Sequence, residues 1–366
     1  MNTDLLKQLI SIPSYVDENS NEEQFAIFLE KYINDNLPWL TTERQIVEEK
    51  RFNLIAKGKE NPKIIFLSHM DTVLPSGDIE KCFEPYEKDS KLYGLGSADM
   101  KGGMAMAILA TQNNPRNDVA LIFDCDEEYY FKGAKKLLKE YSFNPEILIC
   151  PEPTDLKIIN GCRGIFEIEF NVIGKTAHAG TPDNGVNAIE NSIYIVDELK
   201  AMLQKEQTDL GLTTVNLSAI NGGRQCEKEI KIQANAVPDI AHILLDIRVA
   251  NTKITKEYVI EKLTGFAKKR NIQLKNIQFN IEYAPLLTEK EDLKAFESLL
   301  IDASLNIQYE DISKVGFFES AIFCKAWNCP GVIFGPIGEG HIVGESVGIE
   351  SLEKTYEVFD SFLKKK

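Results

Sequence analysis

The sequence lacks the features that mark membrane proteins and nucleic-acid-binding proteins. No apolar run approaches the roughly 20 residues that a membrane span needs, and the start of the chain has no basic segment followed by an apolar one, as a targeting signal would. Basic residues are the minority, because 41 lysines and arginines stand against 56 acids, a formal net charge of −15. Since an acidic surface repels a phosphate backbone, we expect no membrane and no nucleic-acid partner.

Paired cysteines are also missing. The seven cysteines are an odd number, and no two have the CxxC spacing of a metal or redox motif. This pattern is typical of a reducing compartment, where cysteines serve as small apolar residues, so we expect a cytoplasmic protein. A catalytic thiol stays open as an alternative, because Cys125 and Cys150 lie beside the candidate ligands described below.

Apolar residues, in contrast, are plentiful: they make up 43% of the 366 residues, enough for the cores of two domains. Short apolar runs at 64–67 and 119–123 alternate with helical segments. This alternation favours a parallel sheet with helices on both faces. Ser20 and Glu23 have the spacing of a capping box, which predicts the start of one of these helices.

The pattern changes between residues 164 and 284. The order of the segments there is β-α-β-β-α-β, which is that of a ferredoxin-like unit. Larger helices resume after it. We therefore predict a discontinuous α/β domain of residues 1–163 and 285–366, with a smaller α+β domain of residues 164–284 inserted into it.

Acids and histidines gather in short segments that mostly follow predicted strands. In open α/β sheets, ligands bind at the carboxyl ends of the strands, so this shared location is informative. His69 follows the run 64–67, and Asp71, two residues on, can accept a hydrogen bond from its second ring nitrogen. His341 is the only histidine of the C-terminal segment. Taken singly, each histidine is explained equally well as a structural or surface residue.

Three of these segments are rich in carboxylates. Asp99 stands in a glycine-rich turn before a predicted helix, where it can bridge two cations or simply cap the helix. Segment 124–128 packs acids at the end of a buried strand, which is costly without cations. One glutamate of the pair Glu127 and Glu128 can bind metal while its neighbour acts as general base, unless the segment is a solvated turn. Glu152 lies between two prolines, either as a rigidly held ligand or in an ordinary proline turn.

Considered together, the segments indicate one metal site. The chain has only four histidines, and two of them fall in these segments beside the acids Asp99, Glu128 and Glu152. Mixed histidine and carboxylate ligands suit zinc, manganese or cobalt. Their wide spacing along the chain predicts a site that is assembled by the fold.

The segments also carry a family resemblance. They read, in order, SHMDTV, YGLGSADMKGG, DEEYYFKGA, PEPT, GKTAHAGTPDNGVNAI, NAVPDIAHILLDIR and FGPIGEGHIVGE. Together they span nearly the whole chain and resemble the zinc aminoacylase and exopeptidase family, which includes acetylornithine deacetylase, succinyl-diaminopimelate desuccinylase, the aminoacylases and glutamate carboxypeptidase. The resemblance implies a phosphorylase/hydrolase-like zinc-exopeptidase catalytic domain with an inserted ferredoxin-like domain that serves for dimerisation or as a lid.

The resemblance further implies a site with two divalent metal ions, zinc first, with cobalt or manganese as alternatives. The implied ligands are His69, Asp99, Glu128, Glu152 and His341. Asp99 would bridge the ions, with His69 and Glu152 on one and Glu128 and His341 on the other. Asp71 would orient His69. Glu127 would be the general base that takes a proton from the attacking water and passes it to the leaving amine.

In the inserted domain, the resemblance assigns roles to three more residues. His178 would stabilise the tetrahedral oxyanion, often by reaching across a homodimer into the partner's site. Asn235 and Arg248 resemble residues that bind the carboxylate of the substrate, for which an arginine fork is well suited. A structural ion pair stays open as the alternative for Arg248.

These expectations define a function. We expect a cytoplasmic metal-dependent hydrolase that cleaves the amide bond of small N-acyl-amino acids, of the acetylornithine deacetylase or succinyl-diaminopimelate desuccinylase type, in amino-acid biosynthesis. A dipeptidase or glutamate-type carboxypeptidase of the same family, acting on short peptides, is the first alternative. A non-catalytic metal- or amino-acid-binding protein and a cysteine hydrolase are alternatives from other classes. Glu127 argues against the binding protein, because a binding module needs no base.

Overall fold

The chain folds into two units, each built on its own sheet. The computed structural model describes residues 3–227 and 229–365. Unit 1 comprises Met1–Gly161, Thr288–Asp311 and Phe318–Lys366, and unit 2 comprises Cys162–Leu287 and Ile312–Phe317. The short segment Ile312–Phe317 packs with unit 2, although the division from the sequence places it in the larger domain.

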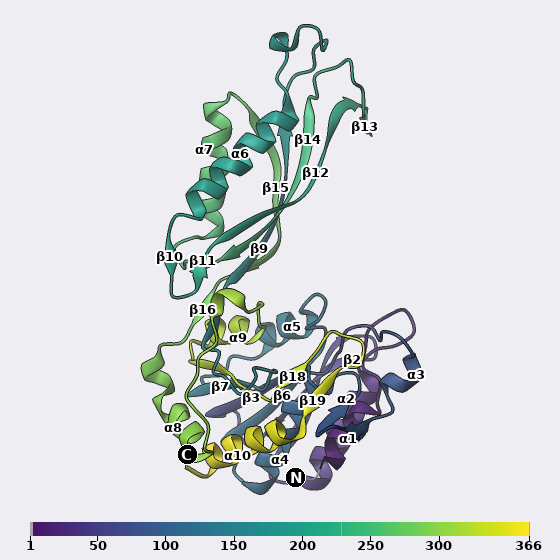
Figure 1. Cartoon of the computed structure of the whole chain (residues 1–366), viewed down its shortest axis with the longest axis vertical. Helices are drawn as coiled ribbons and strands as arrows, with labels where there is room; N and C mark the ends of the chain where they lie inside the picture. The colour runs from purple at the N-terminus through teal and green to yellow at the C-terminus, as the bar shows by residue number, and fades with distance from the viewer. Residues whose placement is uncertain (1–2, 228, 366) are drawn as a thin grey trace. The chain divides into compact units, whose positions relative to one another are not determined.

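The apolar runs of unit 1 form the middle of a six-stranded sheet of order β1-β2-β6-β3-β7-β17 (Figure 1). The strands are β1 Thr41–Glu48, β2 Arg51–Lys57, β3 Ile64–His69, β6 Val119–Asp124, β7 Ile147–Cys150 and β17 Gly331–Ile333. The last four are parallel and buried along their whole length, because both faces of the sheet are covered. The pair β1–β2 is antiparallel, which corrects the expectation of a parallel sheet. A short turn joins these two strands, whereas a parallel pair would need a long crossover.

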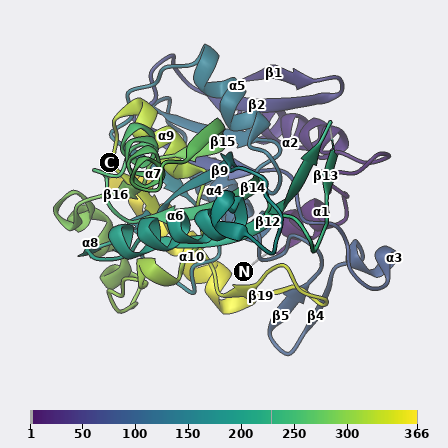
Figure 2. The same cartoon turned by 90° about the horizontal axis from the view of Figure 1, so that it is seen from above.

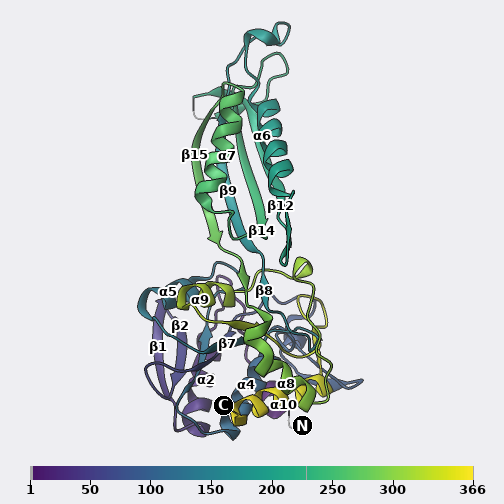
Figure 3. The same cartoon turned by 90° about the vertical axis from the view of Figure 1, so that its left-hand side faces the viewer.

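Helices cover both faces of this sheet. They are α1 Asp4–Ile10, α2 Glu23–Asn36, α4 Lys101–Asn113, α5 Lys132–Glu140, α8 Lys294–Asp302, α9 Ser320–Trp327 and α10 Ile349–Lys365, with a single turn at α3 Ile79–Cys82. α4 and α10 pack together on one face, and α5 and α9 pack on the other (Figure 3). Among the residues that the structure describes, none of the helices has the length and apolar character needed to cross a membrane.

The predicted capping box at the start of α2 is wrong. The helix begins at Glu23, whose N–H donates to the side chain of Asn21 at 2.9 Å, and the N-cap residue Glu22 makes no side-chain cap bond. Ser20 is instead held in a turn by Asp17, whose carboxylate accepts a hydrogen bond from the Ser20 N–H at 2.7 Å. The residue before the helix, Glu22, is buried and pairs with Arg51.

A second, four-stranded sheet of unit 1 has the order β18-β19-β5-β4. Figure 2 labels its strands β19, β5 and β4. Its strands are β4 Tyr86–Lys88, β5 Lys91–Tyr93, β18 Gly338–Glu339 and β19 Ser346–Gly348. β19 pairs with β5, so the loop 340–345 between β18 and β19 lies beside the glycine-rich segment that follows β5. The N–H of Gly94 donates to the Glu345 carbonyl at 3.1 Å and fixes this contact.

Unit 2 has a five-stranded antiparallel sheet of order β13-β12-β14-β9-β15. Its elements are β9 Gly164–Ile173, α6 Ala188–Leu203, β12 Thr214–Cys226, β13 Glu229–Lys231, β14 Ile240–Val249, α7 Lys256–Lys269 and β15 Gln273–Tyr283. Alternate residues of β9 and β14 are buried beneath α6 and α7, and the intervening residues form the open face (Figure 3). The minor elements of the chain are β8 Gly161–Cys162, η1 Pro182–Asn184, β10 Gln207–Thr208, β11 Gly211–Leu212, β16 Leu286–Leu287, η2 Lys290–Leu293 and η3 Ile312–Lys314.

Candidate metal centre

The carboxyl ends of adjacent parallel strands bring three acidic segments of unit 1 together. His69 is the last residue of β3, and its partner in β6 is Asp124, which begins the segment that carries Glu127 and Glu128. β7, on the other side of β3, ends two residues before Glu152. The edge of the sheet therefore collects side chains that are far apart in the sequence.

Asp99 lies between two imidazoles. Its Oδ1 is 3.1 Å from His69 Nε2, and its Oδ2 is 3.2 Å from His341 Nε2. Glu152 Oε1 lies 3.5 Å from the first of these nitrogens, and Glu128 Oε1 lies 2.8 Å from the second. The five side chains thus form two groups of one histidine and one glutamate, and each group faces one oxygen of Asp99.

The composition of this cluster fits divalent cations. Single ligand atoms of His69, Asp99 and Glu128 lie within 4.8 Å of one another. Imidazole nitrogens and carboxylate oxygens are good ligands for zinc, and a carboxylate with an oxygen toward each group is suited to bridging. Three carboxylates around two imidazoles also give the cluster an excess of negative charge that bound cations would balance.

The electrostatics of the cluster reflect the crowding of buried acids. Burial raises the pKa of Glu152 well above its usual value, and Asp99 adds to this. Burial would also raise the pKa of Asp99, but hydrogen bonds from His341 and His69 outweigh it and hold this pKa low. The hydrogen bonds that Asp99 and Glu128 accept from His341 raise the pKa of this histidine to about 10. The two imidazoles and Asp99 therefore hold one another in charged forms, whereas burial favours the protonated form of Glu152.

Asp71 organises the site in a different way from the one expected. His69 Nδ1 lies 3.0 Å from the backbone carbonyl of Asp71 and 3.6 Å from its carboxylate. The carboxylate instead accepts the backbone N–H groups of Glu127 at 3.1 Å and Glu128 at 3.0 Å. Asp71 therefore holds the turn that carries the candidate base and one candidate ligand, and it fixes the His69 ring through its backbone.

Glu127 lies within the electrostatic field of the cluster. Burial raises the pKa of its carboxyl well above the usual value, and the nearby acids Glu128, Asp71 and Asp99 raise it further, although His69 opposes them. A carboxyl with a raised pKa can accept a proton and return it near neutral pH, which a general base must do.

Glu345 is a structural residue of the site that sequence reasoning missed. It is 3% exposed, and its Oε1 accepts the backbone N–H groups of Ala98 at 2.9 Å and Asp99 at 3.0 Å. Burial raises its pKa to about 7. The sequence shows a glutamate four residues after His341, but nothing in that spacing indicates that it holds the backbone of Asp99.

Two glycines allow the close approach of the segments. A Cβ on Gly340 would lie 2.9 Å from the Cβ of Asp99, and a Cβ on Gly103 would lie 1.7 Å from the backbone oxygen of Pro151. The first contact brings the loop of His341 onto Asp99, and the second brings α4 onto the segment of Glu152. Any larger residue would push these segments apart.

The two cysteines beside the cluster are packing residues. Cys125 and Cys150 are both fully buried. Burial raises the pKa of both thiols, and neighbouring acids raise it further. A buried thiol of this kind is not a nucleophile, so the cysteine-hydrolase alternative has no support here.

The three candidate residues of unit 2 are arranged differently. His178 is exposed, and its Nδ1 accepts the N–H of Gly180 at 3.0 Å. A β-bridge between His178 and Ala236 brings Asn235 beside it. Arg248 lies near the opposite end of β14, eight residues after Ile240, or about 26 Å along the strand. Within one chain, Asn235 and Arg248 therefore do not form a common carboxylate site.

The guanidinium of Arg248 already has a carboxylate partner. Its Nε and Nη2 donate to the two oxygens of Asp246 at 2.9 and 3.1 Å. The two residues alternate with buried ones along β14, so both stand on the open face of the sheet. This is the ion pair that the sequence left open as the alternative role of Arg248.

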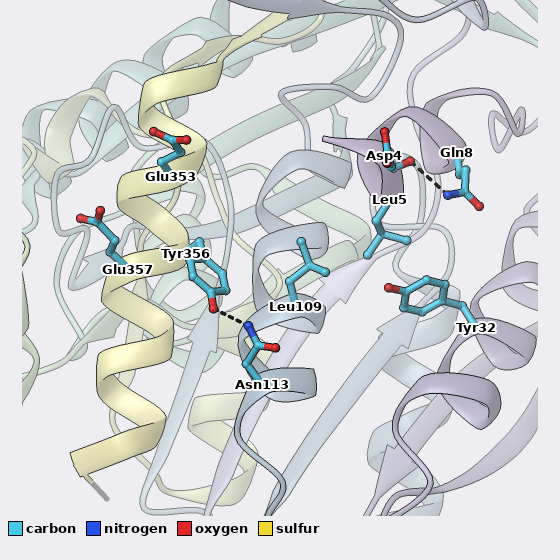
Figure 4. Close-up of a pocket in the computed structure, with 9 residues that line it drawn as sticks. All are labelled: Asp4, Leu5, Gln8, Tyr32, Leu109, Asn113, Glu353, Tyr356 and Glu357. Atoms are coloured by element: carbon cyan, nitrogen blue, oxygen red, sulfur yellow. Dashed lines mark hydrogen bonds between the residues drawn. The ribbon is translucent and has the colours of Figure 1, made fainter. Parts of the chain in front are cut away.

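A cavity of about 570 Å³ lies elsewhere in unit 1, between α1, α2, α4 and α10 (Figure 4). Leu5 and Leu109 form its apolar part, and the hydroxyl of Tyr356 at its side accepts a hydrogen bond from Asn113. None of the site residues predicted from the sequence lines it. Its size alone does not make it a candidate for the chemistry.

Known proteins resemble this chain along most of its length. The model of Peptidase family M20/M25/M40 matches residues 65–365. An acetylornithine deacetylase of Buchnera aphidicola subsp. Schizaphis graminum (strain Sg) is 27% identical over 319 residues, which cover 80% of this chain and 81% of that protein. The solved structure of aminopeptidase PepT from Bacillus cereus ATCC 10987 has a TM-score of 0.76 and 22% identity, covering 100% of this chain and 99% of its own. That of Bacillus subtilis YXEP protein, a dinuclear metal binding peptidase from the M20 family, has a TM-score of 0.68 and 14% identity, with 98% and 96% covered.

Proposed function

The chain belongs to peptidase family M20/M25/M40 and is a metal-dependent hydrolase, and from this premise we propose that it cleaves the amide bond of N-acyl-amino acids. The family membership confirms the fold expected from the sequence, an α/β catalytic domain with an inserted ferredoxin-like domain. The observation that carries the proposal is Asp99 between two histidine–glutamate groups, with Glu127 on the adjoining turn. The products would be a carboxylate and a free amino acid, as in amino-acid biosynthesis in the cytoplasm.

We further propose that two divalent ions occupy the centre. His69 and Glu152 would hold one ion and His341 and Glu128 the other, with Asp99 as the shared ligand. The donor set suits zinc, with cobalt or manganese as alternatives. Bound cations would supply Lewis acidity for the scissile carbonyl and for the attacking water.

The residues of the chain carry the proton transfers. Glu127 takes a proton from the attacking water and passes it to the nitrogen of the leaving amine, so that both products leave in stable forms. Asp71 keeps Glu127 in place through the hydrogen bond from the Glu127 N–H at 3.1 Å. Because this bond is made by the backbone, the Glu127 carboxyl itself stays available for the proton.

For the substrate, we propose roles for the three residues of unit 2. His178 would stabilise the oxyanion, and Asn235 and Arg248 would bind the amino-acid carboxylate. Since His178 and Asn235 lie at one end of the sheet and Arg248 near the other, we propose that the first two act in the site of the partner subunit of a homodimer. Arg248 would act within its own chain, by exchanging Asp246 for the carboxylate of the substrate.

Metal removal and a substrate panel test the proposal. Protein stripped with a chelator should lose hydrolysis of N-acetylornithine, N-succinyl-diaminopimelate and N-acylglutamates, and zinc, cobalt or manganese should restore it. An unchanged rate after metal removal would contradict the two-metal mechanism. Cleavage of dipeptides in place of all N-acyl-amino acids would favour the alternative of a dipeptidase or carboxypeptidase, which uses the same centre with a different pocket.

A further inference from the structure

A pocket of about 220 Å³ adjoins the candidate metal centre within unit 1. Its walls come from the segment 73–82 after β3, from β4, from β5 with the following Gly94 and Leu95, and from the loop 341–345. His341, a proposed ligand, and Glu345, which holds the backbone of Asp99, both line it. A group that fills this pocket therefore lies directly beside the proposed reaction centre.

The groups that the pocket offers to a ligand are apolar. Leu74 is 52% exposed and Val343 is 72% exposed, although both are large aliphatic side chains. Ile342, beside them, is 47% exposed, and the ring of Tyr86 stacks on that of Tyr93 with 4.9 Å between centroids. A contiguous apolar surface of this kind at the edge of an active site is typical of a substrate-binding surface.

Several polar groups of the walls already have partners within the chain. Asp78 and Lys81 form an ion pair at 2.9 Å. The Cys82 thiol donates to the backbone oxygens of Ser76 and Asp78, and the Glu345 carboxylate accepts two backbone N–H groups. A charged group entering the pocket would compete with these partners, so a neutral apolar group fits better.

We propose that this pocket binds the acyl group of the substrate and selects an apolar acyl chain or ring larger than acetyl. The inference rests on the proposed function. In that function Asn235 and Arg248 of unit 2 bind the amino-acid half of the substrate, which leaves the acyl half for a pocket that lies wholly within unit 1. The volume equals roughly seven waters at about 30 Å³ each, which is room for a hexanoyl or benzoyl group.

A series of acyl groups on one amino acid tests the proposal. We expect kcat/KM to rise about fourfold for each buried methylene, or roughly 250-fold over the four methylenes from acetyl to hexanoyl. The matched series keeps the acetyl group and lengthens the amino-acid side chain from alanine to norleucine, and it should show a much smaller rise. Cleavage with equal rates along the acyl series, or a steep rise only along the side-chain series, would overturn the assignment. Failure to cleave any N-acyl-amino acid would instead contradict the proposed function.

Variants of the pocket give an independent test. Leu74→Asp and Val343→Asp should each lower the ratio of hexanoyl to acetyl kcat/KM at least tenfold, because a carboxylate would face the acyl chain. The ratio does not depend on how much of the variant is folded. Ile46→Asp is the matched control, because Ile46 is 61% exposed on β1 and lines no part of the pocket. If both pocket variants keep the wild-type ratio, the pocket does not bind the acyl group.

Discussion

The two units hold their candidate residues in opposite ways. In unit 1, side chains from separate segments converge to 2.8–3.5 Å of one another around Asp99. In unit 2, His178 is exposed, and Arg248 lies near the far end of β14 in an ion pair with Asp246. The carboxyl ends of parallel strands lie at one edge of a sheet. Along a single long strand, by contrast, residues move apart by about 3.3 Å for each position. A single chain can therefore bring the candidate metal ligands of unit 1 together, but not the candidate substrate-binding residues of unit 2.

The strongest test of this difference removes the proposed general base, Glu127, from unit 1. Glu127→Ala should lower kcat by about 10²–10⁴-fold, because general-base catalysis contributes that much. Metal content, measured by elemental analysis, should stay at the wild-type level, since Glu127 is not a proposed ligand. Glu128→Ala is the matched variant one residue on, and it should lose both activity and metal. A Glu127→Ala enzyme with wild-type kcat would remove this residue from the mechanism.

Arg248 tests whether unit 2 contributes substrate binding. Arg248→Ala should raise KM or lower kcat/KM by about tenfold or more, because a charge-assisted hydrogen bond to the substrate carboxylate is lost. Arg248→Lys should recover only part of this effect, since a lysine cannot form the two-pronged contact.

Asp246→Asn is the matched control for Arg248. It breaks the same ion pair but leaves the guanidinium free for the substrate. Under the proposed role, kcat/KM stays at or above the wild-type value. If both variants lose kcat/KM and thermal stability equally, the pair is structural and the proposed role of Arg248 is wrong.

The difference between the units also explains what the sequence could predict. Apolar residues alternate with polar ones along β9, and they recur at helical spacing in α7, Lys256–Lys269. Patterns of this kind are sufficient to predict the ferredoxin-like unit. The hairpin β1–β2 was missed because β1, with the sequence TTERQIVE, is mostly exposed and polar at the edge of the sheet. A strand with so few apolar residues cannot be predicted from the spacing of apolar residues.

The same limit applies to the candidate site. Strand ends indicate that His69, the segment 124–128 and Glu152 meet, because that follows from parallel topology alone. The position of Asp99 between two imidazoles depends on how the loop 340–345 packs, and this follows from backbone contacts such as those of Glu345. The pair of Asp246 and Arg248 was open to sequence reasoning, because residues two apart on a strand share a face.

Mixed dimers test the proposed action of His178 in the partner's site. His178→Ala and Glu127→Ala subunits, each inactive alone, should recover roughly a quarter of wild-type activity when exchanged at equal amounts, because half of the dimers then hold one complete site. The activity of the mixture and its size by light scattering give the answer. No recovery in a mixture that forms mixed dimers would show that His178 acts within its own chain, and an active monomer would exclude the dimer.

A smaller effect concerns the acids buried behind the centre of unit 1. Asp124 and Glu319 are both 0–1% exposed, and their carboxyl groups interact with one another. Burial raises the pKa of Asp124 to about 7. Burial also raises the pKa of Glu319 well above its usual value, and the neighbouring Asp124 raises it further. Neither carboxylate can donate while both are ionised, so the pair is best satisfied when one of them holds a proton.

This pair predicts how stability depends on pH. An Asp carboxyl titrates near 4 in an unfolded chain, so between about pH 4 and pH 7 the folded state binds a proton that the unfolded state has released. Stability therefore falls as the pH rises through this window, by at most a few kcal/mol. Asp124→Asn should flatten the dependence, as measured by urea unfolding of metal-free protein at about pH 5 and pH 7.5. If the unfolding free energy of the variant depends on pH as strongly as that of the wild type, the proton is held by another group and not by Asp124.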